Sequence, residues 1–112
     1  MSERRRTFRV AERIREVVAW ELQRAADPRF ELVTVTSVMV SPDLRQAKVY
    51  WTVSGGEGRR AEAQEALDSA GSLFRRALGK DLGARFVPEI KFFYDDTLDV
   101  SENVARLMEK VK

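Results

Sequence analysis

The sequence of 112 residues is 44% hydrophobic and 34% charged, with a formal net charge of +2, a composition typical of one folded globular domain. It contains neither histidine nor cysteine, which excludes Ser-His-Asp triads, disulfides and metal sites built on imidazole or thiolate ligands. No apolar run approaches the roughly 20 residues that cross a membrane, and the basic N-terminus lacks the apolar stretch of a signal peptide. We therefore expect a cytoplasmic protein with no membrane partner and no cofactor.

The first predicted helix runs from about Arg5 to Ala26. Its apolar residues recur at three- and four-residue steps, the period of an amphipathic helix, at Val10, Ile14, Val17, Val18, Leu22 and Ala25. Trp20 lies off this stripe, at a boundary or on a contact surface. The helix should end near Asp27-Pro28, because proline disfavours the helical conformation in the residue before it.

Two predicted strands follow, from Glu31 to Val40 and from Arg45 to Val53. The first is dense in β-branched residues, and the second alternates apolar with polar positions. The residues between them, Ser41-Pro42-Asp43-Leu44, have turn chemistry, so the two strands should form an antiparallel hairpin. Trp51 falls on the apolar side of the second strand, which favours a core position over a role in stacking on nucleic-acid bases.

Helical spacing returns after a flexible connector at residues 54–58. The apolar positions of this second pattern are Ala63, Ala66, Leu67, Ala70, Phe74, Ala77 and Leu78. Three small residues, Ser69, Ala70 and Gly71, lie in its middle, and Gly/Ser combinations are common at helix kinks. Because the apolar register passes through them without a slip, we predict a bent helix pair with no loop.

A third strand is predicted from Arg85 to Tyr94, and a short helix with apolar residues from Val100 to Val111, capped by Asp96 or Thr97. The order α-β-β-α-kink-α-β with a short C-terminal helix indicates a two-layer α+β domain, in which the crossover between the second and third strands allows them to pair in parallel. This order resembles the type II KH domain. We place the KH-like domain at residues 1–98 and a helical tail at residues 99–112.

KH modules clamp single-stranded nucleic acid on a GxxG loop between two helices. A literal GxxG occurs at Gly55-Gly56-Glu57-Gly58, but it precedes the helix pair and carries an acid where a phosphate would lie. We interpret it as a plain strand-to-helix connector.

The basic residues are concentrated in two places. Residues 3–15 hold six Arg and two Glu, and Arg5, Arg9 and Arg13 form a row at four-residue steps. Like charges at this spacing repel, which suggests an external anion such as a nucleic-acid phosphate. The cluster as a whole comprises Arg4, Arg5, Arg6, Arg9 and Arg13.

The second concentration follows the bend. Residues 57–70 have a balance of −2, whereas residues 71–85 carry four bases against Asp81. These bases are Arg75, Arg76, Lys80 and Arg85. A phosphate-contacting surface and an ordinary solvated helix face both account for them.

Three acids near the end of the third strand, Asp95, Asp96 and Asp99, could be taken for a divalent-metal site. Helix capping and the helix dipole explain the same residues more simply. We therefore predict no metal.

Four stretches resemble the bacterial ribosome-binding factor A family. They are Arg9-Val10-Ala11-Glu12, Asp27-Pro28-Arg29, VTVTSVMVSPDLRQAKVYW from Val33 to Trp51, and VPEIKFFYDDTL from Val87 to Leu98.

The resemblance implies a KH-type domain whose GxxG loop is replaced by an Ala-x-Gly helix kink, here at Ser69-Ala70-Gly71 with Ser in the first position. It implies a non-enzymatic, monomeric factor that binds the free small (30S) ribosomal subunit and its 16S rRNA. It further implies a role in late rRNA maturation, including 5′-end processing, and in cold adaptation. Carried over by position, the binding surface would include Arg5, Arg9, Arg13, Arg75, Arg76 and Lys80, with Arg45 and Lys48 beside them.

Three other functions remain open from the residues alone. They are a general single-stranded RNA-binding module acting outside the ribosome, a protein-interaction domain using the acidic C-terminal helix, and an RNA-cleaving enzyme using the three acids.

Overall fold

The computed structural model of the chain describes residues 3–83, 87–97 and 108. Its elements are α1 (Glu3–Arg24), the 3-10 turn η1 (Pro28–Phe30), β1 (Val33–Val40), β2 (Gln46–Val53), α2 (Glu57–Ser69), α3 (Gly71–Leu82) and β3 (Glu89–Tyr94). The predicted C-terminal helix falls on residues 98–112, which lie outside the described residues except for Met108.

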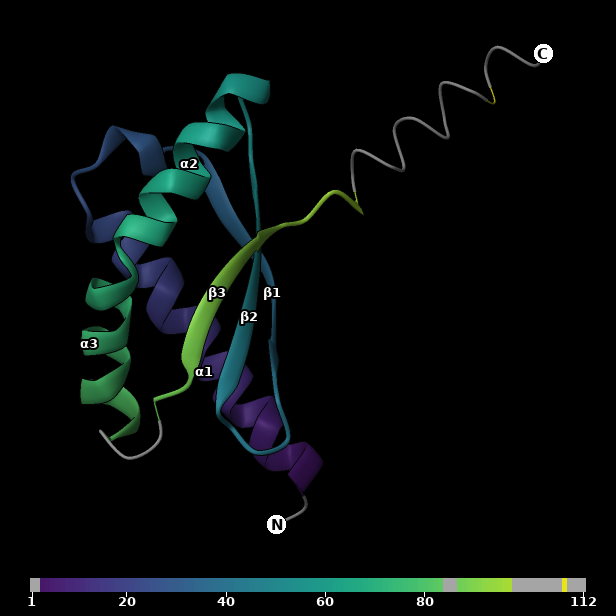
Figure 1. The fold of residues 1–112 in the computed structure, drawn as a ribbon, viewed down its shortest axis with the longest axis vertical. Coiled ribbons are helices and arrows are strands. Elements are labelled where there is room, and N and C mark those ends of the chain that lie inside the picture. The colour runs from purple at the N-terminus through teal and green to yellow at the C-terminus, as the bar shows by residue number, and fades with distance from the viewer. Residues whose placement is uncertain (1–2, 84–86, 98–107, 109–112) are drawn as a thin grey trace.

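The strands form one sheet in the order β1-β2-β3. The β1–β2 pair is an antiparallel hairpin and the β2–β3 pair is parallel, which confirms the hairpin and the crossover predicted from the sequence. Figure 1 shows α1, α2 and α3 on one side of this sheet, and none of the described helices covers its other face. The domain is therefore the expected two-layer α+β structure.

All three strands start later than predicted, the second by one residue, at Gln46 and not at Arg45. The first strand begins at Val33, not at Glu31, because η1 and the left-handed backbone of Leu32, with φ of 62°, turn the chain before it pairs. The third begins at Glu89, whose N–H donates to the carbonyl of Arg45 over 2.8 Å. The predicted start at Arg85 lies outside the described residues.

β1 contains a β-bulge between Val35 and Ser37. The inward side chains are Val33 and Val35 before the bulge and Val38 and Val40 after it, so the extra residue, Thr36, shifts the alternation by one place. Its hydroxyl donates to Asp95 over 2.6 Å, and the N–H of Asp95 donates to the carbonyl of Trp51 over 2.7 Å. The end of β3 is thereby tied to both other strands.

The core lies between the sheet and the helices and has Trp51 near its centre, with 0% of its surface exposed. Trp51 is therefore a core residue, as predicted. Its indole N–H donates to the side-chain oxygen of Gln64 on α2 over 3.1 Å, and its ring meets Tyr94 edge-on at a centroid distance of 5.2 Å.

The bend between α2 and α3 occupies a single residue. Ala70 has φ of −89° and ψ of 9°, and its N–H is shared between the carbonyls of Ala66 and Leu67 at 3.0 and 3.2 Å. The N–H of Phe74 already donates to the carbonyl of Ala70 over 3.1 Å. The buried positions continue through the bend, at Ala63, Ala66, Leu67, Phe74 and Leu78. The prediction of a kinked helix pair without a loop is confirmed.

Candidate nucleic-acid interface

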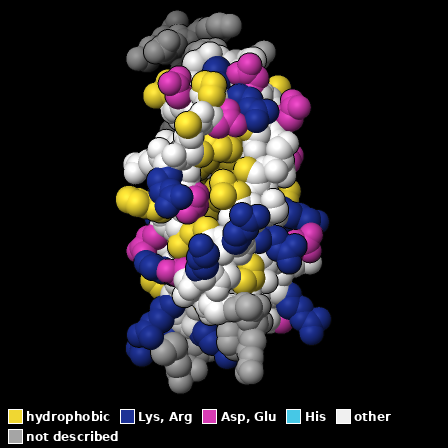
Figure 2. Space-filling model, turned by 90° about the vertical axis from the view of Figure 1, so that its left-hand side faces the viewer, with side chains coloured by type: hydrophobic (Ala, Val, Ile, Leu, Met, Phe, Trp, Pro, Cys, Tyr) yellow, Lys and Arg dark blue, Asp and Glu magenta, His cyan; other side chains and the backbone are white. Residues whose placement is uncertain are grey.

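A groove of about 700 Å³ runs between α1 and α3 on the helical face of the molecule. Its apolar floor includes Val17, Leu73 and Ala77, and the large ring of Trp20 lies beside them with 60% of its surface exposed. Figure 2 shows apolar side chains in the middle of this face, with Lys and Arg side chains around them and most numerous in its lower half. An exposed indole among cations suits a partner that has both flat rings and negative charge.

Four cations line the groove together with three acids. The cations are Arg13, Arg24, Arg76 and Lys80, and the acids are Glu16, Glu21 and Asp81. The helical period explains the set from α1, because positions 13, 17, 20 and 24 follow one another at three- and four-residue steps along one face. The sequence therefore contained a signal for Arg24, although this residue was not among the predicted ones; Leu73 was missed in the same way.

Arg13 connects the two walls of the groove. Its Nε donates to Asp81 over 2.5 Å, its Nη2 contacts the same carboxylate, and its Nη1 lies 2.7 Å from Glu16. The hydrogen bond from Arg13 holds the pKa of Asp81 below its ordinary value, and these contacts raise the pKa of Arg13. The third member of the row of arginines at four-residue steps is therefore already paired with two acids of the same chain.

The remaining N-terminal arginines are exposed on the first turns of α1. Arg4, Arg5 and Arg9 surround the exposed ring of Phe8, and Arg6 lies on the same turns. The structure therefore gathers the predicted cluster at one end of α1, apart from Arg13.

The other predicted RNA-binding residues occupy different surfaces. Arg75 is exposed on α3 but does not line the groove. Arg45 is exposed at the end of the β1–β2 turn, and Lys48 is exposed on the open face of the sheet. Arg85 lies outside the described residues.

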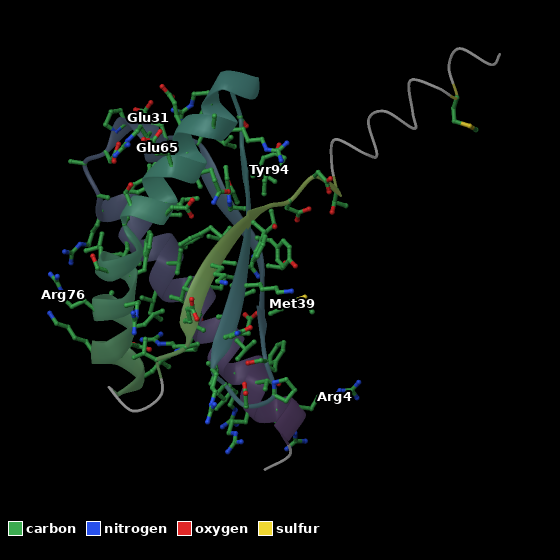
Figure 3. The ribbon with its side chains drawn as sticks, in the orientation of Figure 1. Arg4, Glu31, Met39, Glu65, Arg76 and Tyr94 are labelled. Atoms are coloured by element: carbon green, nitrogen blue, oxygen red, sulfur yellow. The ribbon has the colours of Figure 1, made fainter. Side chains whose placement is uncertain are left out.

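Acidic and basic side chains are unevenly distributed along the long axis of the molecule. Figure 3 shows Glu31 and Glu65 near one end, Arg76 on the flank and Arg4 at the other end. The acidic α2 and the basic α3 meet at Ala70, so the change of sign seen in the sequence becomes a spatial separation.

The comparisons with known proteins agree with one another. The family model described as ribosome-binding factor A matches residues 6–108. A ribosome-binding factor A from Citrifermentans bemidjiense is 35% identical over 108 residues, which cover 96% of this chain and 91% of the relative. The chain belongs to the ribosome-binding factor A family.

A crystal structure and a fitted homology model from the same family share the fold. The crystal structure of ribosome-binding factor A from Thermus thermophilus is 27% identical, with a TM-score of 0.69 over 79% of this chain and 94% of that one. A Thermus thermophilus ribosome-binding factor A homology model fitted into the cryo-EM map of a 30S complex is 28% identical, with a TM-score of 0.64 over 76% and 90% of the two chains. The fold is KH-like, as the sequence predicted.

The literal GxxG follows a different course from a KH phosphate loop. Gly55 and Gly56 have φ of 110° and 95°, and Gly56 immediately precedes the first turn of α2. The segment is thus a strand-to-helix connector, as predicted. Arg59, one turn later, donates to the carbonyl of Glu31 over 2.5 Å and anchors α2 to the segment that precedes β1. The segment between α2 and α3, where a KH domain has its GxxG loop, is the kink at Ala70.

The three acids after β3 do not gather into a described metal site. Within residues 3–83, 87–97 and 108, no group of three His, Cys, Asp or Glu side chains could hold a metal ion, and Asp99 lies outside these residues. Asp95 accepts hydrogen bonds from the Thr36 hydroxyl and from the N–H of Thr97 over 3.0 Å, and these bonds lower the pKa of its carboxyl. Asp95 thus accepts the backbone N–H of Thr97. The helix predicted to be capped by Asp96 or Thr97 lies outside the described residues except for Met108. In the same described ranges, every helix is too short or too polar to cross a membrane.

Proposed function

We propose that this protein binds the free small (30S) ribosomal subunit through its 16S rRNA, using the groove between α1 and α3 and the arginines at the start of α1. The observation that carries the proposal is the exposed Trp20 with Arg24, Arg76 and Lys80 around it. Membership of the family supports the ribosomal partner, as does the likeness to a relative fitted into the map of a 30S complex.

The chemistry of the groove favours rRNA phosphates over a sequence motif. Arginine pairs bidentately with phosphate oxygens, and such contacts fix position without reading bases. The exposed indole can stack on an unpaired base. The shape and charge of the folded rRNA should therefore decide where the protein binds, with Arg4, Arg5, Arg6 and Arg9 extending the contact along α1.

The finer role follows from the family resemblance. We infer a non-enzymatic factor that acts as a monomer in the cytoplasm without a membrane partner or cofactor. By binding the immature subunit it would assist late rRNA maturation, including processing of the 5′ end, and would support growth in the cold. In a bacterial strain that lacks its own family member, the gene should restore cold growth and reduce precursor rRNA; failure of both would contradict this role.

Charge reversals on the groove test the binding surface. Arg24→Glu with Arg76→Glu should weaken binding to purified 30S subunits, measured by co-sedimentation at several salt concentrations. The slope of log affinity against log salt should fall by about 1 for each phosphate that the variant no longer neutralises.

The matched control for Arg24→Glu alone is Arg15→Glu, which makes the same charge change on the opposite side of α1, where Arg15 lies beside Ala19 and Leu22. It should leave binding close to that of the parent. Equal effects of Arg24→Glu and Arg15→Glu would show that only net charge matters and would overturn the assignment of the groove. Equal affinity of the parent for arbitrary single-stranded RNA and for the subunit would favour the general RNA-binding module.

A further inference from the structure

The open face of the sheet carries an ordered pattern that the groove does not use. Strand register places Met39, Lys48 and Lys91 in one row across the three strands, and Ser37, Tyr50 and Phe93 in the next. These residues alternate with the buried Ala47, Val49, Trp51 and Phe92, so they lie on the side away from the helices. Figure 3 shows Met39 pointing away from the helical layer.

The aromatic row is a preformed pair of rings. The centroids of Tyr50 and Phe93 lie 5.9 Å apart with 34° between their planes, and 40% of the surface of Phe93 is exposed. Phe93 and Met39, which is 63% exposed, are the large apolar side chains most open to water on this face. Exposed aromatic side chains on the face of a sheet are a platform on which nucleic-acid bases stack.

The lysine row adds positive charge beside the rings. Lys48 and Lys91 occupy directly paired positions on parallel strands, an arrangement in which like charges destabilise the sheet. Lys48 Nζ lies 5.8 Å from the Phe93 centroid, and no acid among the described residues forms an ion pair with either lysine.

Within the described part of the chain, the acids of this face occur in its flanking rows. Glu89 pairs with Gln46 in the row before the lysines. At the other end, Asp95 is bound by Thr36 and Thr97. The middle of the face is therefore both aromatic and cationic.

We propose that this sheet platform, defined as Lys48, Lys91, Tyr50 and Phe93, binds an unpaired segment of RNA. Its bases stack on the two rings, and its phosphates lie against the two lysines. Because the platform and the α1–α3 groove lie on opposite sides of the sheet, one protein molecule can hold two RNA segments at once. The inference shares the RNA partner with the proposed function but concerns a separate surface.

A short oligonucleotide tests the platform without the ribosome. The probe is a single-stranded oligouridine about eight nucleotides long, and the measurements are fluorescence anisotropy and NMR chemical shifts of the full chain. Phe93→Thr removes the exposed ring and keeps a residue suited to strands, and it should weaken binding about tenfold. Lys48→Gln with Lys91→Gln should reduce the slope of log affinity against log salt by about 1.4.

The matched control is Arg76→Gln with Lys80→Gln, which removes two cations from the groove. It should weaken 30S binding and should weaken oligonucleotide binding less than either sheet variant does, so the contributions of the two surfaces can be distinguished. Circular dichroism and thermal melting of each variant confirm that it folds.

Two results would overturn the platform. One is oligonucleotide binding that is abolished in the groove variant but retained in both sheet variants. The other is concentration-dependent self-association of the parent that Phe93→Thr abolishes while oligonucleotide binding persists, which would show that a second copy covers this face.

Discussion

The side-chain amide of Gln64 on α2 forms hydrogen bonds with residues of both β2 and β3. Its oxygen accepts the indole N–H of Trp51 over 3.1 Å, while its nitrogen donates to the carbonyl of Phe92 over 3.1 Å and to Asp68 over 3.0 Å. One side chain of α2 therefore satisfies a buried donor on β2 and a strand carbonyl on β3. Without it, the indole N–H would be buried with no acceptor.

Replacing Gln64 with Leu should destabilise the protein by about 1–3 kcal/mol, the cost of leaving a buried polar group unpaired. Urea unfolding followed by circular dichroism measures the change. Glu65→Leu, an exposed position on the same helix, should change stability by less than about 0.5 kcal/mol. Equal effects of the two substitutions would contradict the role given to the amide.

The ion pair between Arg13 and Asp81 is a second interaction that depends on two individual side chains. Because hydrogen bonding to Arg13 lowers the pKa of Asp81 in the folded state, ionised Asp81 stabilises the fold. This contribution is complete above the unfolded pKa of about 3.9 and disappears as the pH falls through the lower folded value.

Asp81→Asn should therefore lower the melting temperature near neutral pH and have a shrinking effect as the pH falls below about 4. Thermal melts of both proteins between neutral and strongly acidic pH give this difference directly. Glu12→Gln removes an exposed carboxylate from α1 without touching the Arg13 pair and should not reproduce the trend. A constant difference across the whole range would show that the ion pair does not stabilise the fold.

At the scale of elements, the bend at Ala70 decides how α3 presents its cations. Gly71 begins α3 with an ordinary backbone, and a Cβ added there would meet nothing within 4 Å. Gly83 ends α3 with φ of 86°, a conformation that side chains disfavour. The backbone therefore tolerates a side chain at Gly71, whereas the conformation at Gly83 favours glycine.

Gly71→Ala should stabilise the protein by about 0.5–1 kcal/mol, because alanine favours a helix and restricts the unfolded chain. The same substitution at Gly83 should destabilise it by about 1 kcal/mol or more. Denaturant unfolding compares the pair. If the bend only orients α3, Gly71→Ala should also keep 30S binding unchanged, whereas weaker binding would show that RNA approaches the backbone at this point.

The elements themselves show what periodicity predicts and what it does not. The spacing of Ala63, Ala66, Leu67, Phe74 and Leu78 was sufficient to predict a kink without a loop. The start of β1 was misplaced because a short 3-10 turn and the left-handed Leu32 have no strong sequence signal. The partnership of Arg13 with Asp81 joins residues 68 positions apart, and spacing along one helix carries no information about such a contact.

At the scale of the whole molecule, the fold sorts residues onto surfaces that the linear sequence leaves mixed. A set of arginines and lysines predicted an RNA-binding surface, yet the structure divides them among the groove, the N-terminal end of α1 and the open sheet face, with Arg75 and Arg45 exposed outside all three. Lys48 lies across the sheet from Arg76 because one belongs to a strand and the other to a covering helix. Only the order β1-β2-β3 and the one-sided helical layer determine this division.

That same strand order leaves β1 and β3 as the two edges of the sheet. An unprotected edge can recruit the strand of a neighbouring molecule and begin aggregation. Here Pro88 precedes β3 and cannot donate a backbone hydrogen bond, and the charged side chains of Glu89 and Lys91 are exposed along β3. The bulge at Thr36 twists the middle of β1. Both margins of the sheet are therefore poor templates for growth, and the protein can keep one broad, water-facing sheet surface without polymerising along its edges.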